Sequence, residues 1–365
     1  MKLVTIIVAL LSLSLVNAKE VKAENKEQEE KKEKSLLFVP GPSYDPQAEF
    51  GLTLILLKLF KIDKEDEISP PSTFALIAKG TTNDSLMGGV ASKLFFKKDK
   101  WRVSYAIFKG NFVGEMYLID TSRFIDTNSN VFAYRFNAQM QVYKNLYLGL
   151  GSFTSKIDFT PAGGSSNKEK NTSISILSDY DTKDNQFATN SGENASVDLH
   201  LFRKSLGNKE DFETITLTYT KYISLRGNKN RHLAVIADSS FRLGSGALNY
   251  NYKYGNGGRQ RGYTGRVFEG KNMLRTEIEY KHFFESILKE RFGIATFAGI
   301  GTVYGGQSQV GNPLPQKLKD APLLPHIGFG PRYRIVPEKN LNTRIDFAYG
   351  REKEFTLYFS LSEAI

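Results

Sequence analysis

The chain has 365 residues, of which 40% are hydrophobic and none is cysteine, and its formal charge is +10. The lack of cysteine excludes disulfide-stapled folds and thiolate metal sites. Aromatic residues make up 12% of the chain, far more than disordered chains contain. After the first residues no apolar run approaches the ~20 residues of a membrane-spanning helix, which excludes a polytopic helical membrane protein. The 26 Phe and 18 Tyr are still a heavy aromatic load for a chain that is 24% charged.

The N-terminal residues predict export. Lys2 precedes an apolar run over 3–16, and Asn17-Ala18 ends in the small residue that a cleavage site requires. We interpret 1–18 as a signal peptide cleaved after Ala18. The alternative, a buried helix or single anchor, is disfavoured because the run is shorter than the ~20 residues that cross a bilayer. Residues 19–34 contain six Lys and six Glu with almost nothing apolar, which predicts a solvated periplasmic tether.

From 35 onwards the apolar residues recur with a period of two. Phe132, Tyr134 and Phe136 alternate with polar residues such as Arg135 and Asn137, a pattern typical of a strand with one apolar and one polar face. The same alternation recurs near the C-terminus, at 274–281, 342–349 and 355–362.

The length of these runs indicates the class of β-protein. Many are about 9 to 13 residues long, which matches a tilted strand that crosses a bilayer, whereas strands of soluble sandwiches average about 5 to 6 residues. A transmembrane antiparallel β-barrel turns its apolar face to lipid and its polar face to the lumen. We therefore predict an all-β transmembrane barrel over 35–365 in the cell outer membrane. A soluble all-β protein is the alternative.

The number of strands follows from parity. Fifteen alternating runs lie between 47 and 362, and an odd number would place the two termini on opposite sides of the membrane. A first strand over 35–44 gives sixteen, although Pro40 and Pro42 suit an edge better than the centre of a ladder. The tight links 97–100 and 143–145 are then periplasmic. Three long loops, 160–171, 243–272 and 304–324, then face outwards.

Four motifs follow one another along the chain. The first is the acidic run Ser-Asp-Tyr-Asp-Thr-Lys-Asp-Asn, which contains Tyr180, Asp181, Asp184 and Asn185. The second is a loop tip that contains Gly257, Gly258, Arg261, Gly262 and Tyr263, together with the strand that follows it. The third is the segment 328–333 and the fourth is the closing segment 358–365. In this order the motifs resemble the bacterial surface antigen family, whose superfamily includes outer-membrane protein assembly factors and two-partner-secretion translocators.

The resemblance implies that the loop tip folds back into the lumen and that its arginine meets carboxylates of the inner wall. A guanidinium in a narrow lumen must be paired, and its planar fork suits carboxylate oxygens. We expect Arg261 to pair with Glu279, with Glu277 or Asp346 as alternates, because these residues lie on the polar register of their strands. The alternative is that Arg261 is a solvated loop residue. The family often has an Asp where this chain has Gly299, which removes one expected partner.

Relatives that translocate polypeptides carry periplasmic POTRA domains, and 19–34 is too short for one, so we expect a barrel without them. The resemblance implies a role in outer-membrane biogenesis or translocation. The alternatives are a passive, porin-like channel and a structural surface antigen.

No catalytic or metal-binding arrangement can be recognised. The four histidines have no metal-ligand spacing and no Gly-x-Ser-x-Gly elbow occurs, so we expect no enzyme, no metal and no cofactor. The expected partners are outer-membrane lipid and lipopolysaccharide, the barrel-assembly machinery during insertion, and a periplasmic partner bound through the tether. We expect no nucleic acid as a partner, because in an exported barrel the positive charge suits acidic groups of the cell surface.

Overall fold

In a computed structural model of the chain, sixteen antiparallel strands form one closed barrel. The structure describes residues 36–45, 49–118, 123–244, 251–255, 260–263, 268–305, 315–351 and 355–361. The expected signal peptide 1–18 and tether 19–34 lie outside these residues, as do Gly257 and Gly258 of the loop tip. No helix among the described residues has the length and apolar character to cross a membrane.

The first half of the barrel wall is made by strands β1 Leu36–Asp45, β2 Glu49–Phe60, β3 Ser72–Thr81, β4 Leu86–Phe96, β5 Trp101–Leu118, β6 Arg123–Tyr143, β7 Leu146–Pro161 and β8 Asn167–Asp181. The second half is made by β9 Gly192–Phe202, β10 Phe212–Leu225, β11 Asn228–Gly244, β14 Asn272–Phe283, β15 Phe292–Tyr304, β16 Leu324–Val336, β17 Leu341–Gly350 and β18 Phe355–Leu361. Short 3-10 helices occur at η1 Lys204–Leu206, η4 Leu318–Asp320 and η5 Pro337–Lys339.

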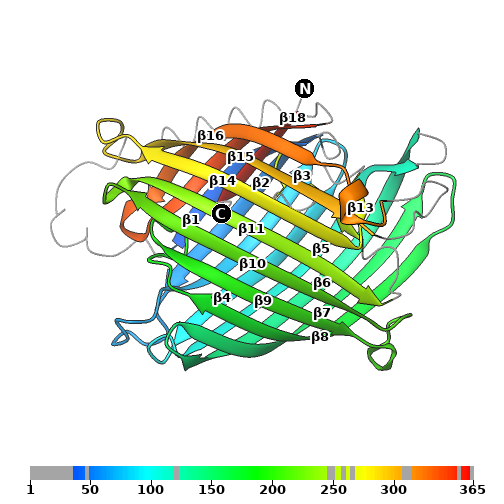
Figure 1. Cartoon of the computed structure of the whole chain (residues 1–365), viewed down its shortest axis with the longest axis horizontal. Helices are drawn as coiled ribbons and strands as arrows, with labels where there is room; N and C mark the ends of the chain where they lie inside the picture. The colour runs from blue at the N-terminus through cyan, green and yellow to red at the C-terminus, as the bar shows by residue number, and fades with distance from the viewer. Residues whose placement is uncertain are drawn as a thin grey trace. The chain divides into compact units, whose positions relative to one another are not determined.

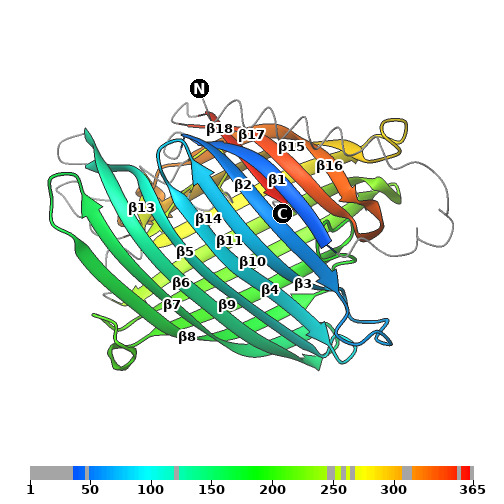
Figure 2. The same ribbon diagram turned by 180° about the vertical axis from the view of Figure 1, so that it is seen from behind.

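Each of the sixteen wall strands pairs with the next wall strand along the chain, and β1 closes the barrel by pairing with β18 (Figures 1 and 2). The predicted first strand is thereby confirmed, and Pro40 and Pro42 lie in a strand at the seam between the two ends of the sheet. The described register between β1 and β18 is Tyr44↔Leu357. By contrast, β17 and β18 are in register from Thr343↔Leu361 to Tyr349↔Phe355.

The wall is continuous between β11 and β14, although two further strands lie between them in the sequence. These two strands are paired directly, from Arg231↔His282 to Phe241↔Asn272. Part of the chain between them forms a separate two-stranded sheet of β12 Tyr252–Lys253 and β13 Glu269–Gly270. The segment expected to be a long outward loop at 243–272 therefore contains a small hairpin of its own.

Strands β5 to β8 are longer than the alternation predicted, and they project at the left of Figure 2. The sequence predicted strands over 101–109 and 130–143, whereas β5 ends at Leu118 and β6 begins at Arg123. The expected loop 160–171 likewise shrinks to 162–166. The extra residues of β6 are 123–129. They include Asn128, which has the same register as the apolar Phe132 and Tyr134 further along the strand. The alternation of apolar and polar residues is therefore lost there, while the strand pairing continues.

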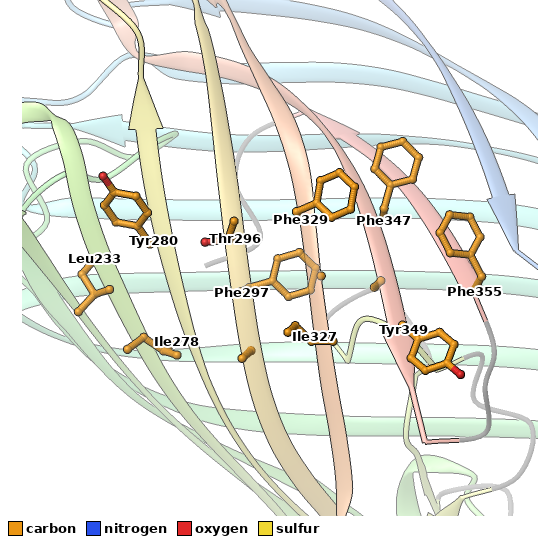
Figure 3. A pocket seen from close by; sticks show the side chains of 13 residues that line it. Leu233, Ile278, Tyr280, Thr296, Phe297, Ile327, Phe329, Phe347, Tyr349 and Phe355 are labelled. Atoms are coloured by element: carbon orange, nitrogen blue, oxygen red, sulfur yellow. The ribbon is translucent and has the colours of Figure 1, made fainter.

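The outward face of the wall is apolar. Leu150 on β7 is 63% exposed and Phe136 on β6 is 45% exposed, although both lie in mid-strand. Over β14 to β18 small outward residues leave a furrow of about 620 Å³, which Figure 3 shows between rings such as Phe329, Phe347 and Phe355. Soluble monomers rarely expose such a continuous apolar surface, so this face is suited to lipid.

The lumen has an apolar cluster near the seam, at the end where β1 begins. Leu37 and Val39 of β1 are buried there with Leu57 and Leu59 of β2 and Leu341 of β17. We call these five residues the seam cluster. Phe187, from the connection between β8 and β9, also packs against it.

Candidate functional site

The loop that follows β11 is packed against the inner wall. Tyr254 and Tyr263 are buried with Met273 of β14, Val303 of β15 and Leu324 of β16. The two tyrosine rings meet edge to face with their centroids 5.0 Å apart, a favourable arrangement of aromatic quadrupoles. This apolar contact holds the loop tip, residues 260–263, against the wall.

Three carboxylates surround the guanidinium of Arg261. Its Nη1 lies 2.7 Å from Oε2 of Glu279 and 2.9 Å from Oδ2 of Asp346. Its Nη2 donates to Oε1 of Glu277. All four side chains are essentially inaccessible to solvent. The structure thus brings together the arginine and all three of its candidate partners, and Arg261 is not a solvated loop residue.

An aromatic ring supports the guanidinium from one side. The Cζ atom of Arg261 lies 3.3 Å from the centroid of the Phe297 ring, and a desolvated cation over a ring face is attracted by the quadrupole of the ring. Gly328, the cross-strand neighbour of Phe297, makes room for the ring. A Cβ atom at 328 would lie 2.2 Å from Cζ of Phe297.

Further cations neutralise the carboxylates from the wall. Arg332 Nη1 lies 2.7 Å from Oδ1 of Asp346, and Arg344 also donates to Asp346. Lys281 Nζ lies 3.5 Å from Oε1 of Glu279. A buried charge is tolerated only when it is paired, so these side chains form one network that depends on each of its members.

His326 lies beside Gly299, the position at which the sequence resemblance implies an acidic residue. Gly299 and His326 are direct cross-strand partners, and a Cβ atom at 299 would lie 2.5 Å from Cε1 of the imidazole. His326 Nε2 is 2.6 Å from Oε2 of Glu277. Gly299 therefore does not leave a gap in the site, because the imidazole fills it and contacts a carboxylate partner of Arg261.

Backbone contacts tie the loop tip to the last strands. The Gly262 amide donates to Oγ1 of Thr356 at 3.1 Å, and the Tyr358 hydroxyl donates to the Tyr263 carbonyl at 3.0 Å. Gly262 has φ +87°, and a Cβ atom there would lie 2.9 Å from the Gly350 amide nitrogen. The position thus requires glycine both for its conformation and for its close approach to β17.

Sequence reasoning missed five members of this site: Phe297, Lys281, His326, Arg332 and Arg344. A usable signal existed, since each lies on the register of its strand that faces the lumen and is buried there. A row of charged residues on the inward register of consecutive strands indicates a lumenal ion-pair network.

The acidic motif lies elsewhere, at the opposite end of the strands. Asp181 Oδ2 is 2.8 Å from Nη1 of Arg102, whose guanidinium also stacks on Tyr147 at 3.7 Å. Asp184 and Asn185 accept backbone amide hydrogen bonds within the β8–β9 connection. Tyr180 is 37% exposed. The motif therefore shapes this connection and does not contact Arg261.

The connection over 182–191, which we call the strap, crosses the lumen. Strands β8 and β9 lie half-way round the barrel from the seam, yet Phe187 packs against the seam cluster. Gln186 donates to the Pro71 carbonyl at 2.7 Å, and Asn340 donates to the Ala188 carbonyl at 3.2 Å. The strap thus covers one end of the lumen.

Among the described residues no group of three or more His, Asp or Glu side chains could hold a metal ion. The ion pairs of Arg261 with Glu277, Glu279 and Asp346 make the site a buried ion-pair lock on a loop.

Comparisons with known proteins identify a fold. No family model matches the chain, and no curated protein matches its sequence. Solved structures do match: BamA from Haemophilus ducreyi lacking POTRA domains 1–3 has a TM-score of 0.56 at 12% identity, over 90% of this chain and 70% of that one. CdiB from Acinetobacter baumannii has a TM-score of 0.58 at 10% identity, over 89% of this chain and 59% of that one.

CdiB from Escherichia coli gives a TM-score of 0.59 at 8% identity, over 90% of this chain and 62% of that one. The chain thus spans about three fifths of the length of the two CdiB chains. It has the barrel fold of these outer-membrane proteins, as the motifs predicted.

Proposed function

We propose that the protein is an integral outer-membrane β-barrel of the surface antigen and assembly-factor kind, and that it acts in outer-membrane biogenesis or polypeptide translocation. The observation that carries the proposal is the lock on the loop tip, in which Arg261 is buried among Glu277, Glu279 and Asp346. This is the feature that the family resemblance implies. Burial of one arginine with three carboxylates carries a large desolvation cost, which suggests that a fixed position of the loop serves the function.

The contacts of the loop tip indicate what the lock could control. Thr356 and Tyr358, which bind its backbone, belong to β18, the strand that pairs with β1 at the seam. The loop tip is therefore connected to the part of the wall where the two ends of the sheet meet. A barrel that disturbs lipid locally or opens at the seam would need such a connection.

The main alternative, a passive channel, is disfavoured by two obstructions in series. The loop tip projects into the lumen and packs against β14 to β17, and the strap crosses the end where β1 begins. A steady pore requires an open path through both.

We also propose how the protein reaches the membrane and which partners it meets there. Residues 1–18 would direct export and be removed after Ala18, the barrel-assembly machinery would insert the barrel, and the tether 19–34 would offer a periplasmic partner a place to bind. Outer-membrane lipid and lipopolysaccharide would surround the apolar outward face.

Depletion of the protein in its own host tests the proposal. We expect lower levels of other outer-membrane proteins or a loss of lipid asymmetry, restored by the wild-type chain and not by Arg261→Ala. Normal membranes after depletion, combined with large steady conductance in planar bilayers, would establish the channel instead. Binding through the outer loops with neither effect would establish a structural surface antigen.

A further inference from the structure

The wall opposite the Arg261 site carries a basic groove on its outward face, at the end of β4 to β8 away from the strap. Two rows of cross-strand partners line it. The first row is Gly88, Lys109, Phe132, Lys156 and Lys170. The second row, one pair further towards the rim, is Leu86, Asn111, Asn130, Asp158 and Lys168. Direct cross-strand partners project from the same face of a sheet, so all four lysines share one face.

That face is the outward one. Phe132 has the same register as Phe136, which is 45% exposed on the apolar outside, whereas Arg135 of the opposite register pairs with Asp198 across the lumen. The next row away from the rim contains Ile107 and Tyr134. The lysines therefore begin where the apolar belt of the barrel ends.

The groove is hollow and positively charged. Its volume is about 870 Å³, and the missing side chain of Gly88 adds space beside Lys109. Among the described residues that line the groove, Asp158 is the one carboxylate on the same face as the four ammonium groups, and it lies 3.9 Å from Lys168. Asp126, on the same register of β6, is exposed further towards the rim. Glu169, although it is adjacent in sequence, is buried on the other face.

We propose that this groove binds the phosphate-bearing headgroup of a membrane lipid, whose acyl chains lie along the adjoining apolar rows. Lysine binds phosphate as a point charge on a flexible stem, and four lysines suit a headgroup with more than one phosphate. The inference rests on the proposed position of the barrel in the outer membrane. With the short turns in the periplasm, the groove lies in the outer leaflet, where the lipid is a phosphorylated glycolipid.

A lipid fits the groove better than a free anion does because the groove continues into the apolar belt. Phe132 stands between Lys109 and Lys156 in the first row, and an aromatic ring among basic side chains is characteristic of a membrane interface. A soluble phosphate would use the charge but not the ring or the apolar rows beside it.

The test uses the full-length protein in phosphatidylcholine nanodiscs with and without diphosphorylated lipid A. The groove variant is K109Q/K156Q/K168Q/K170Q. Its matched control removes four exposed lysines from the opposite end of the strands, as K64Q/K100Q/K229Q/K289Q. Native mass spectrometry measures the lipid A retained by each protein, and folding is checked by heat-modifiable mobility in gels.

We expect the wild type and the control to retain lipid A and the groove variant to lose affinity by about fivefold for each lysine removed. Equal retention by the groove variant and the wild type would overturn the proposal, as would equal losses in both variants. Displacement of lipid A by inorganic phosphate of similar affinity would show a free-anion site and would also overturn it. If depletion leaves the envelope normal while the groove retains lipid A, only the biogenesis proposal fails.

Discussion

Arg261 and Phe297 are stacked, with the guanidinium carbon 3.3 Å from the centroid of the ring. The stacking leaves the edge of the guanidinium free for carboxylates. Asp346 and Glu277 accept hydrogen bonds from its Nη1 and Nη2, and Glu279 forms an ion pair with Nη1. One face and the two terminal nitrogens of the group are thus contacted by residues of β14, β15 and β17. The loop tip is held by the inner wall and not by its own loop.

Arg261→Ala should destabilise the barrel by about 3 to 5 kcal/mol, because it leaves buried carboxylates with too few partners. The matched control is Arg135→Ala, which breaks the solvated lumenal pair with Asp198 and should cost at most about 1 kcal/mol. Denaturant unfolding followed by gel mobility measures both. Similar losses in the two variants would contradict the role of burial at Arg261.

The reversed pair Arg261→Glu with Glu279→Arg should recover only part of the stability that each single variant loses. Glu at 261 would gain the arginine at 279 but would still face Glu277 and Asp346, which contact the native guanidinium. The same unfolding measurement applies. The absence of any recovery would count against direct pairing of 261 with 279.

Gly262→Ala should release the loop tip. Its φ of +87° disfavours any L side chain, and its Cβ would also meet β17 at Gly350. Gly163→Ala is the control, because Gly163 has a similar φ of +72° with nothing within 4 Å of an added Cβ. Both variants carry the backbone cost of ~1 kcal/mol, but only Gly262→Ala adds a collision with β17. Limited proteolysis of the loop between β11 and β14 should therefore increase only in Gly262→Ala. Equal cleavage would mean that the contact with β17 is dispensable.

Gly299→Asp alone should destabilise the barrel, because the new side chain collides with the ring of His326. Combination with His326→Gly should recover part of this stability, since the carboxylate can then occupy the space of the imidazole. The contact of the new Cβ atom with the Thr276 carbonyl oxygen remains. Thermal unfolding of the two single variants and the double variant forms a cycle. If the stability losses of the two single variants simply add in the double variant, the side chains at 299 and 326 do not compete for the same space.

Replacement of 185–190 by Asn-Gly, a turn suited to a two-residue hairpin, should remove the strap and keep the β8–β9 pairing. We expect little gain in planar-bilayer conductance, because the loop tip still obstructs the path. Conductance should rise when strap removal is combined with Arg261→Ala. The two obstructions lie in series along one path, so each of them must be removed before ions flow freely. A high conductance after strap removal alone would show that the loop tip does not limit ion flow.

Asp66, in the turn between β2 and β3, should make stability depend on pH. Its carboxylate accepts from the Ser69 hydroxyl at 2.6 Å and from the Lys98 amide at 2.8 Å, and these hydrogen bonds hold its pKa well below the usual range. Because the pKa of Asp66 is lower in the folded state, its ionised carboxylate stabilises the folded state at pH values above its pKa in the unfolded chain, near 3.9. This stabilisation is lost as the pH falls towards the lowered pKa of the folded state. The stability difference between wild type and Asp66→Asn should therefore be full at pH 7 and shrink below about pH 4. A difference that is constant with pH would refute the mechanism.

The barrel and its strand number were predicted from residue patterns along the chain. Alternation in runs such as 130–143 indicates a strand with one apolar and one polar face, and the length of these runs favours a strand that crosses a bilayer. Parity then predicted β1. The inward register of β14 and β17 also made Glu277, Glu279 and Asp346 available to Arg261.

The contacts inside the lumen could not be predicted from these patterns. That Arg261 binds three carboxylates at once, that His326 occupies the space of Gly299, and that the strap reaches the seam cluster all depend on side chains from strands that are remote in sequence. Curvature and stagger of the closed sheet bring such residues together. Alternation specifies the face on which a side chain lies but not its neighbour across the lumen.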